Sequence, residues 1–264
     1  MSVTTTRRLV DRVRAHSEPL SRPDELAVED PLVLSLDGDV LATLMRTPGH
    51  DIELAAGWLV VESGVRAADD IRTLRTCRED DTDRVHISLA AGVRPPRARA
   101  FVTSAACGVC SADVVDLAPL RWAPPHSPGW CATGSMLAGL PDAMRAQQRA
   151  FDRTGAVHAA ALATTGGELV VVREDVGRHN AVDKVVGHAL LNDRLPATDH
   201  LLVVSGRVSF EIVQKAVAAG VAGIVAVSAP TSLAVDLARG ADLVLLGMTR
   251  NGGYNTYAGA DYVC

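Results

Sequence analysis

Two cysteines separated by two residues are the sharpest chemical feature of the sequence. Cys107 and Cys110 lie in a loop of small residues that follows a short predicted strand, and residues 111–113 can begin a helix. A thiolate, rather than a thiol, attacks or carries sulfur, and a helix N-terminus lowers the pKa of a nearby cysteine. Taken alone, the pair fits a structural zinc half-site, a thioredoxin-like redox centre or a sulfur carrier.

Two of these interpretations lack supporting residues elsewhere in the sequence. Zinc prefers four ligands, commonly from a second close pair, whereas Cys77, Cys131 and His126 are isolated along the chain. A thioredoxin-like centre is expected in a compact strand–helix–strand unit, and no such pattern surrounds Cys107. We therefore expect no zinc, and the pair on its own leaves the choice between redox and sulfur chemistry open.

A second motif stands between a predicted strand and a predicted helix. Residues 174–184 read Glu-Asp-Val-Gly-Arg-His-Asn-Ala-Val-Asp-Lys. Gly177 lets the backbone approach a ligand, and the free amides of a helix start favour an anion, with Arg178 and Lys184 nearby. The simpler alternative is a solvated helix cap with ordinary charge pairs.

Other polar residues at strand ends have simpler alternatives too. A lone histidine on an apolar strand, such as His158, is more often a hydrogen-bonded core residue than a ligand. Arg207 is equally explained by a helix cap and a weak ion pair with Glu211, and the stretch after the last strand by an exit turn. The candidate ligand-binding residues are His158, Arg178, His179, Asn180, Lys184, Ser205, Gly206, Arg207, Met248, Thr249, Arg250, Asn251, Gly252 and Gly253.

Alternating strands and helices in the second half predict the framework that holds these residues. Apolar runs predict strands at 157–163, 169–172, 201–204, 224–227 and 243–247, and helices at 180–191, 210–219 and 232–239. This alternation is typical of a mainly parallel sheet covered on both faces. Ligands of such sheets bind beyond the carboxyl ends of the strands, so residues 205–207, 228–230 and 248–253 are candidate binding loops.

The first half predicts a smaller α+β unit. Strands at 32–36 and 40–45 flank Asp37-Gly38, a dipeptide suited to a tight hairpin turn. A helix is expected at 51–61, followed by strands at 71–74 and 85–89. We predict a flexible or edge-docked arm over 1–27, an α+β domain over 28–131 that contains the two-cysteine loop, and an α/β domain over 132–264.

Composition excludes several classes of function. With 264 residues, 48% hydrophobic and 22% charged, the chain can bury a large core. A net charge of -5 and 3% aromatic residues argue against nucleic-acid binding. The sequence shows no apolar segment typical of a signal peptide or membrane span, so we expect a cytoplasmic protein that does not associate with membranes. Five cysteines, an odd number, do not predict a disulfide framework.

Together, these stretches resemble the FdhD family, the accessory sulfurtransferases of formate dehydrogenase. The matching pieces are the Cys107-Gly108-Val109-Cys110 loop, Thr154-Gly155, His158-Ala159-Ala160, the 174–184 motif, Ser205-Gly206-Arg207 and the 248–253 tail. Residues 48–57 are similar as well, so the resemblance covers nearly the whole chain after the arm.

The resemblance implies a three-layer C-terminal domain of the cytidine-deaminase type. It does not imply deamination, because a zinc deaminase needs His-x-Glu and Pro-Cys-x-x-Cys. The stretches that could supply the first motif read His158-Ala159-Ala160 and His179-Asn180-Ala181, without the glutamate.

The resemblance also implies a reaction. In the family, a cysteine desulfurase of the IscS type donates sulfur as a persulfide, and the protein passes it to the bis(molybdopterin guanine dinucleotide) molybdenum cofactor used by formate dehydrogenase. By match, Cys107 carries the persulfide and Cys110 assists, either by resolving it or by polarising it. GDP-like nucleotides are expected to bind, and a homodimer is expected. The alternatives are a non-catalytic cofactor chaperone and a thiol–disulfide oxidoreductase.

Overall fold

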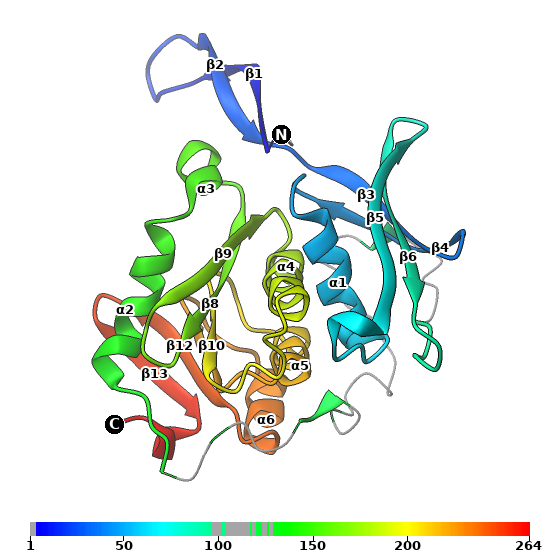
Figure 1. Cartoon of the computed structure of the whole chain (residues 1–264). Coiled ribbons are helices and arrows are strands. Elements are labelled where there is room, and N and C mark those ends of the chain that lie inside the picture. Colours follow the sequence, from blue (N-terminus) through cyan, green and yellow to red (C-terminus); the bar gives the residue numbers. More distant parts are fainter. Residues whose placement is uncertain (1–3, 97–101, 104–116, 118–119, 123–125, 127–128) are drawn as a thin grey trace.

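A six-stranded mixed sheet organises the C-terminal half (Figure 1). The structure, a computed structural model, describes residues 4–96, 102–103, 117, 120–122, 126 and 129–264. The strand order is β13-β12-β11-β10-β8-β9. The bounds are β8 His158–Thr164, β9 Leu169–Asp175, β10 His200–Val204, β11 Gly223–Ala226, β12 Val244–Arg250 and β13 Gly253–Ala258. The pairs β10–β11 and β11–β12 are parallel, and the other three pairs are antiparallel. The prediction of a mainly parallel sheet therefore holds only at its centre.

Helices cover both faces of this sheet, which gives the expected three layers. Helices α4 (Arg178–Leu191), α5 (Phe210–Ala219) and α6 (Ser232–Gly240) cover one face, as predicted. The other face carries α2 (Gly134–Arg145), followed by α3 (Arg149–Thr154). The sequence pattern missed both α2 and α3. Leu137, Leu140 and Met144 of α2 are buried against alanines of β8 such as Ala161, whose small side chains allow a close approach.

The N-terminal half forms a five-stranded sheet of order β5-β6-β3-β4-β7. Its strands are β3 (Asp30–Leu36), β4 (Asp39–Arg46), β5 (Ile71–Glu79), β6 (Thr82–Leu89) and β7 (Val102–Thr103). Helix α1 (Asp51–Glu62) packs between this sheet and α4, and one apolar core runs through all of them (Figure 1). The turn at Asp37-Gly38 has positive φ at both residues, as the hairpin prediction requires. Short 3-10 helices lie at Ala68–Asp70 and Ala260–Tyr262.

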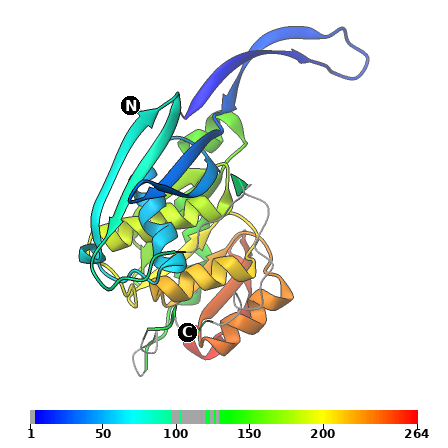
Figure 2. The ribbon, with the colours of Figure 1, turned by 90° about the vertical axis from the view of Figure 1, so that its right-hand side faces the viewer.

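The N-terminal arm forms a β-hairpin, which the sequence pattern did not predict over 5–27. Strands β1 (Thr5–Arg12) and β2 (Leu20–Ala27) pair in antiparallel register. The hairpin projects from the rest of the molecule (Figure 2). Glu25 accepts a hydrogen bond from Thr5 and forms an ion pair with Arg153 of α3, which ties the base of the hairpin to the C-terminal half. The hairpin depends on cross-strand pairing, which cannot be predicted from the charged composition of the segment.

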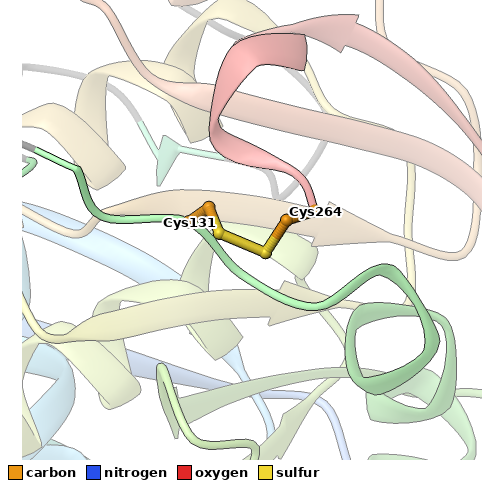
Figure 3. Close-up of a disulfide and its surroundings, with 2 residues drawn as sticks. All are labelled: Cys131 and Cys264. Atoms are coloured by element: carbon orange, nitrogen blue, oxygen red, sulfur yellow. A yellow bond between two sulfur atoms is a disulfide. The ribbon is translucent and has the colours of Figure 1, made fainter.

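Cys131 and Cys264 form one disulfide, which the cysteine pattern of the sequence did not predict (Figure 3). Their Cα atoms are 5.9 Å apart. The C-terminal segment returns to the residues that precede α2, where the Cys264 amide donates to the Ala132 carbonyl at 3.0 Å. An odd count of cysteines could not reveal this pairing, because it joins residues 133 positions apart.

None of the described helices has both the length and the apolar composition that a bilayer span requires.

Two glycines set the distance between α1 and α4. A Cβ atom on Gly57 would overlap the Asp183 carbonyl, and one on Gly187 would overlap the Glu53 carbonyl. Each helix therefore places its backbone directly against the other. Gly139 in α2 differs, because a Cβ there would meet no atom within 4 Å.

We predict that Gly57→Ala and Gly187→Ala each destabilise the protein by about 1–3 kcal/mol, because α1 and α4 must move apart. The control Gly139→Ala should be neutral or stabilise by up to about 1 kcal/mol, since alanine is the better helix former. Urea unfolding followed by circular dichroism measures all three. Equal effects at the three positions would contradict the close helix contact.

Candidate functional site

A cleft of about 520 Å³ lies at the sheet edge where β10, β11 and β12 end. The sheet side of the cleft is formed by His158, Ser205, Val227, Thr249 and Arg250. The helix side is formed by residues of α2, α3 and the segments that follow them, including Arg145, Gln148 and Phe151. This is the edge at which the sequence predicted ligand binding.

His158 and Ser205 meet at this edge because β8 and β10 are antiparallel. The first residue of β8 therefore lies where β10 ends. The Ser205 hydroxyl accepts a hydrogen bond from the Ala159 amide at 2.9 Å, and the Ser205 amide donates to the Ala159 carbonyl at 3.0 Å. A Cβ on Gly206 would stand 3.3 Å from Nδ1 of His158 and 3.6 Å from Cβ of Arg178. Glycine at 206 thus lets the turn pack closely against both side chains.

Positive charge accumulates beside the cleft. Burial, and then the nearby positive charge of Arg207, lower the pKa of Arg178, and Glu211 only partly compensates. The Nε of Arg178 is buried and has no hydrogen-bond partner among the described residues. Burial, and then Arg178, also lower the pKa of His158, which keeps that imidazole neutral at pH 7. An anionic ligand would supply the missing acceptor and relieve the repulsion between the two arginines.

A β-bulge directs Thr249 into the same cleft. The register of β12 against β13 shifts between Gly247 and Arg250, and Met248 has a positive φ of 54°. The Met248 amide donates to the Ser228 carbonyl at 3.1 Å. Thr249 is fully buried, and its Oγ1 has no hydrogen-bond partner among the described residues. Bulges commonly re-aim a side chain next to a binding site.

The rest of the predicted 248–253 loop has another role. Asn251 and Gly252 both have positive φ and form the tight turn that joins β12 to β13. Residues 251–253 are exposed and do not line the cleft. The expected binding loop is therefore a bulged strand end, with Thr249 and Arg250 in the cleft and a hairpin turn beyond them. The polar composition of β13 explains why the sequence did not predict that strand.

Residues of the 174–184 motif hold neighbouring helices and strands in place as well as standing near the cleft. His179 lies between the start of α4 and the start of α5, with Nε2 at 3.1 Å from the Ser209 hydroxyl and at 3.0 Å from Oε2 of Glu211. Both carboxylate oxygens of Glu174 accept from the first amides of α3, at Ala150 and Phe151, each at 2.8 Å. Glu174 thereby holds the helix that carries Phe151 into the cleft.

Asn180 and Lys184 do not line the cleft, in contrast to the prediction. Lys184 is 1% exposed, and its Nζ lies 2.7 Å from Oδ2 of Asp175 and 2.9 Å from the Thr47 carbonyl. The same Asp175 oxygen accepts from the Thr47 amide at 3.2 Å. The side-chain Nδ2 of Asn180 donates to Oδ1 of Asp175 and to the Met45 carbonyl. These groups hold the turn between β4 and α1, which we call the Thr47 clamp, defined by Thr47, Asp175, Asn180 and Lys184.

Sequence reasoning missed Arg145, Gln148 and Phe151, because it did not predict α2 and α3. The apolar spacing Leu137, Leu140 and Met144 was the available signal. Pro141 within α2 interrupts that pattern and obscured the helix.

The cysteine predictions have mixed outcomes. Cys107 and Cys110 lie outside the described residues. Cys77, expected to be isolated, lies beside Glu79 and His86, and Cys131 is bonded to Cys264. Neither neighbourhood follows from spacing along the chain, because cross-strand pairing creates both.

Comparison with known proteins gives consistent matches over the full length. The model of the FdhD/NarQ family matches residues 27–264. A protein of Streptomyces coelicolor named sulfur carrier protein FdhD is 48% identical, covering 100% of this chain and 97% of its own. Proteins of the same name from Corynebacterium efficiens and Mycobacterium tuberculosis are 47% and 40% identical, covering 90% and 100% of this chain and 91% and 100% of their own.

A solved structure supports the fold. A formate dehydrogenase accessory protein from Desulfotalea psychrophila superimposes with a TM-score of 0.82 at 22% identity, covering 99% of this chain and 100% of that one. The likeness confirms the predicted α/β class.

We predict that Lys184→Met costs about 3–5 kcal/mol of stability, because it leaves the Asp175 carboxylate buried without its cation. Adding Asp175→Asn to that variant should restore part of the loss. Arg153→Met, which breaks the exposed ion pair with Glu25, should cost less than about 1 kcal/mol. Denaturant unfolding of the three variants and the unsubstituted protein measures these changes. Equal costs for Lys184→Met and Arg153→Met would contradict the clamp.

Proposed function

This chain belongs to the FdhD/NarQ family, as its motifs predicted, and we propose that it carries sulfur from a cysteine desulfurase to the molybdenum cofactor of formate dehydrogenase. The sulfur is held as a persulfide on Cys107. The cofactor, bis(molybdopterin guanine dinucleotide) molybdenum, is held in the cleft at the sheet edge. The observation that carries the proposal is the cleft at the strand ends, where the Thr249 hydroxyl and, beside the cleft-lining His158, Nε of Arg178 have no hydrogen-bond partner among the described residues.

The cleft fits the guanine nucleotide end of such a cofactor. Its volume of about 520 Å³ lies within the usual range for small-molecule sites. Arg178, whose buried Nε lacks a partner, and the exposed Arg207 can donate to phosphate oxygens, and the Thr249 hydroxyl can bond a polar edge of the ligand. Phe151, with the Arg145 guanidinium 4.7 Å from its ring centre, offers an apolar wall. Nucleotide binding by these side chains requires no metal in the cleft.

The first chemical step takes place on the chain's own cysteine. The Cys107 thiolate attacks the outer sulfur of the desulfurase persulfide, the S–S bond of that persulfide breaks, and the desulfurase thiolate leaves. When bound, the cofactor supplies the metal centre that accepts the sulfur. Release of the sulfur as sulfide requires two electrons, which Cys110 provides in our proposal by forming a disulfide with Cys107.

The protein partners required are a cysteine desulfurase and formate dehydrogenase. Association of the chain with a second copy stays a prediction from the family resemblance. Cofactor binding alone would make the chain a chaperone, and dithiol cycling alone would make it an oxidoreductase. The two predictions below separate these functions.

Nucleotide binding should depend on the arginines beside the cleft. We expect Arg178→Ala and Arg207→Ala each to weaken GDP binding about 10- to 100-fold, because a hydrogen bond to a charged group contributes about 1.5–3 kcal/mol. Arg72→Ala, at an exposed position of β5, should leave the affinity unchanged. Isothermal titration calorimetry measures all three. Absence of GDP binding by the unsubstituted protein, or equal affinities for all variants, would exclude this cleft as the nucleotide site.

Sulfur transfer should require Cys107. After incubation with a cysteine desulfurase and cysteine, alkylation and peptide mapping should locate one added sulfur atom on Cys107. Cys107→Ser should abolish both the added sulfur and the maturation of formate dehydrogenase, while still binding GDP. Cys77→Ser should retain both activities. Maturation by Cys107→Ser would favour the chaperone, and persulfide on another cysteine would refute the assignment.

A further inference from the structure

Three potential ligand atoms converge on the outer side of the N-terminal sheet. Nε2 of His86 lies 3.0 Å from Sγ of Cys77 and 3.1 Å from Oε1 of Glu79, and the sulfur lies 3.3 Å from the same oxygen. His86 and Cys77 are half-buried and Glu79 is exposed. This cluster belongs to the β5–β6 hairpin and to neither the cleft nor the two-cysteine loop.

The register of the hairpin brings the three residues together. Strands β5 and β6 are antiparallel, with Cys77 opposite Arg84 and His86 opposite Arg75. Alternate residues of a strand share one face, so Cys77 and Glu79 lie on the same side of β5. His86 is the diagonal neighbour of Cys77 across the pair, within reach of a long side chain. The cluster therefore follows from strand geometry and is not a chance meeting of loops.

A neighbouring strand orients the imidazole. Ser35 of β3 is paired in register with His86 and is 1% exposed. Its hydroxyl lies 3.4 Å from the Val85 carbonyl, to which it can donate, and 3.1 Å from Nδ1 of His86. With the hydroxyl proton directed at the carbonyl, Nδ1–H of His86 donates to the hydroxyl oxygen. The lone pair of Nε2 then points toward Cys77 and Glu79, which is the arrangement of a metal-binding histidine.

The carboxylate is oriented by an ion pair. Nε of Arg84 lies 3.2 Å from Oε2 of Glu79 without forming a hydrogen bond to it, and the other oxygen, Oε1, faces the cluster. A partner that holds the far atom of a ligand is typical of metal sites. Burial and the neighbouring Glu79 raise the pKa of the Cys77 thiol, and the positive charges of Arg75 and Arg84 offset this only in part, so the metal-free site holds the thiol and a bound cation would displace its proton.

We propose that Cys77, Glu79 and His86 form a binding site for a divalent metal of the zinc class. A tetrahedral zinc ion with bonds of about 2.0–2.3 Å separates its ligand atoms by about 3.3–3.6 Å. The observed N···O and S···O separations of 3.1 and 3.3 Å are close to this range, and the N···S separation of 3.0 Å must widen by about 0.5 Å when the ion binds. A thiolate, an imidazole and a carboxylate suit zinc better than magnesium or calcium. The thiolate and the carboxylate neutralise the ion, and the exposed side leaves the fourth position to water or another small ligand.

The proposal departs from the expectation that the chain binds no zinc. That expectation rested on the missing deaminase motif and on the isolation of Cys77 along the sequence. Strand pairing removes the second reason, because His86 and Glu79 become neighbours of Cys77 only in the folded hairpin. The proposal stands independently of sulfur transfer and of nucleotide binding.

Metal titration of the full-length protein tests the proposal. The Cys107→Ser/Cys110→Ser background removes the two cysteines that could also bind zinc. In that background we expect one equivalent of zinc per chain by competition with a chromophoric chelator. Cobalt(II) should produce the absorption bands of a thiolate-bound ion. Cys77→Ser and His86→Ala should each weaken zinc binding at least 100-fold, and Ser35→Ala about 10- to 100-fold through loss of the imidazole partner.

His16→Ala, at an exposed position between β1 and β2, is the matched control and should bind zinc as the background does. Circular dichroism checks that each variant is folded. Zinc should also raise the melting temperature of the background protein but not that of Cys77→Ser. Absence of zinc binding in the background, or unchanged binding by Cys77→Ser and His86→Ala, would overturn the site.

Discussion

The buried ion pair between Asp175 and Lys184 is the interaction on which the arrangement of the site depends. Both side chains are at most 1% exposed, and both bind the backbone of Thr47 in the turn that precedes α1. Removing a charge of this kind from water is costly unless each group finds its partners, so the pair enforces one position of that turn. The glycine contacts between α1 and α4 act in the same direction, because they let the two helix backbones pack directly against each other. These contacts fix the position of the N-terminal half relative to the edge of the C-terminal sheet that carries the cleft.

The same eleven residues, 174–184, also build the cleft. Glu174 caps α3 and so places Phe151, while Asp175 and Lys184 fasten the turn at Thr47. Arg178, at the first turn of α4, is then left beside the cleft with a buried and unpartnered Nε. One short motif thus supplies both the rigid support and the cationic group, which is how a site built on regular elements maintains its geometry. Substitutions in the motif should therefore fall into two groups, those that destabilise the fold and those that lower the affinity for the ligand.

Local patterns predicted the elements that depend on local physics. Apolar periodicity gave α1, α4, α5 and α6, and the Asp37-Gly38 dipeptide gave the β3–β4 hairpin. Pro141 concealed α2, and polar residues concealed β13. The roles of Asn180 and Lys184 could not be read from the sequence, because their partners at Met45 and Thr47 lie 135 and 137 residues away. The Cys131–Cys264 bond and the Cys77 cluster escaped prediction for the same reason. A cleft does lie at the strand ends where the sequence predicted ligand binding, since the topology of an α/β sheet fixes that edge, and ligand binding there stays a prediction.

Hydrogen–deuterium exchange of the full-length chain with and without GDP tests the central claim most directly, since it locates ligand contact on individual segments of the fold. We expect slower exchange on GDP addition at residues 155–158 and 249–250, which line the cleft, and at 205–207, which begin with the cleft residue Ser205. No change is expected in the β5–β6 hairpin at residues 71–89. Unchanged exchange at the sheet edge, or protection confined to the N-terminal sheet, would contradict the assignment of the cleft as the cofactor site.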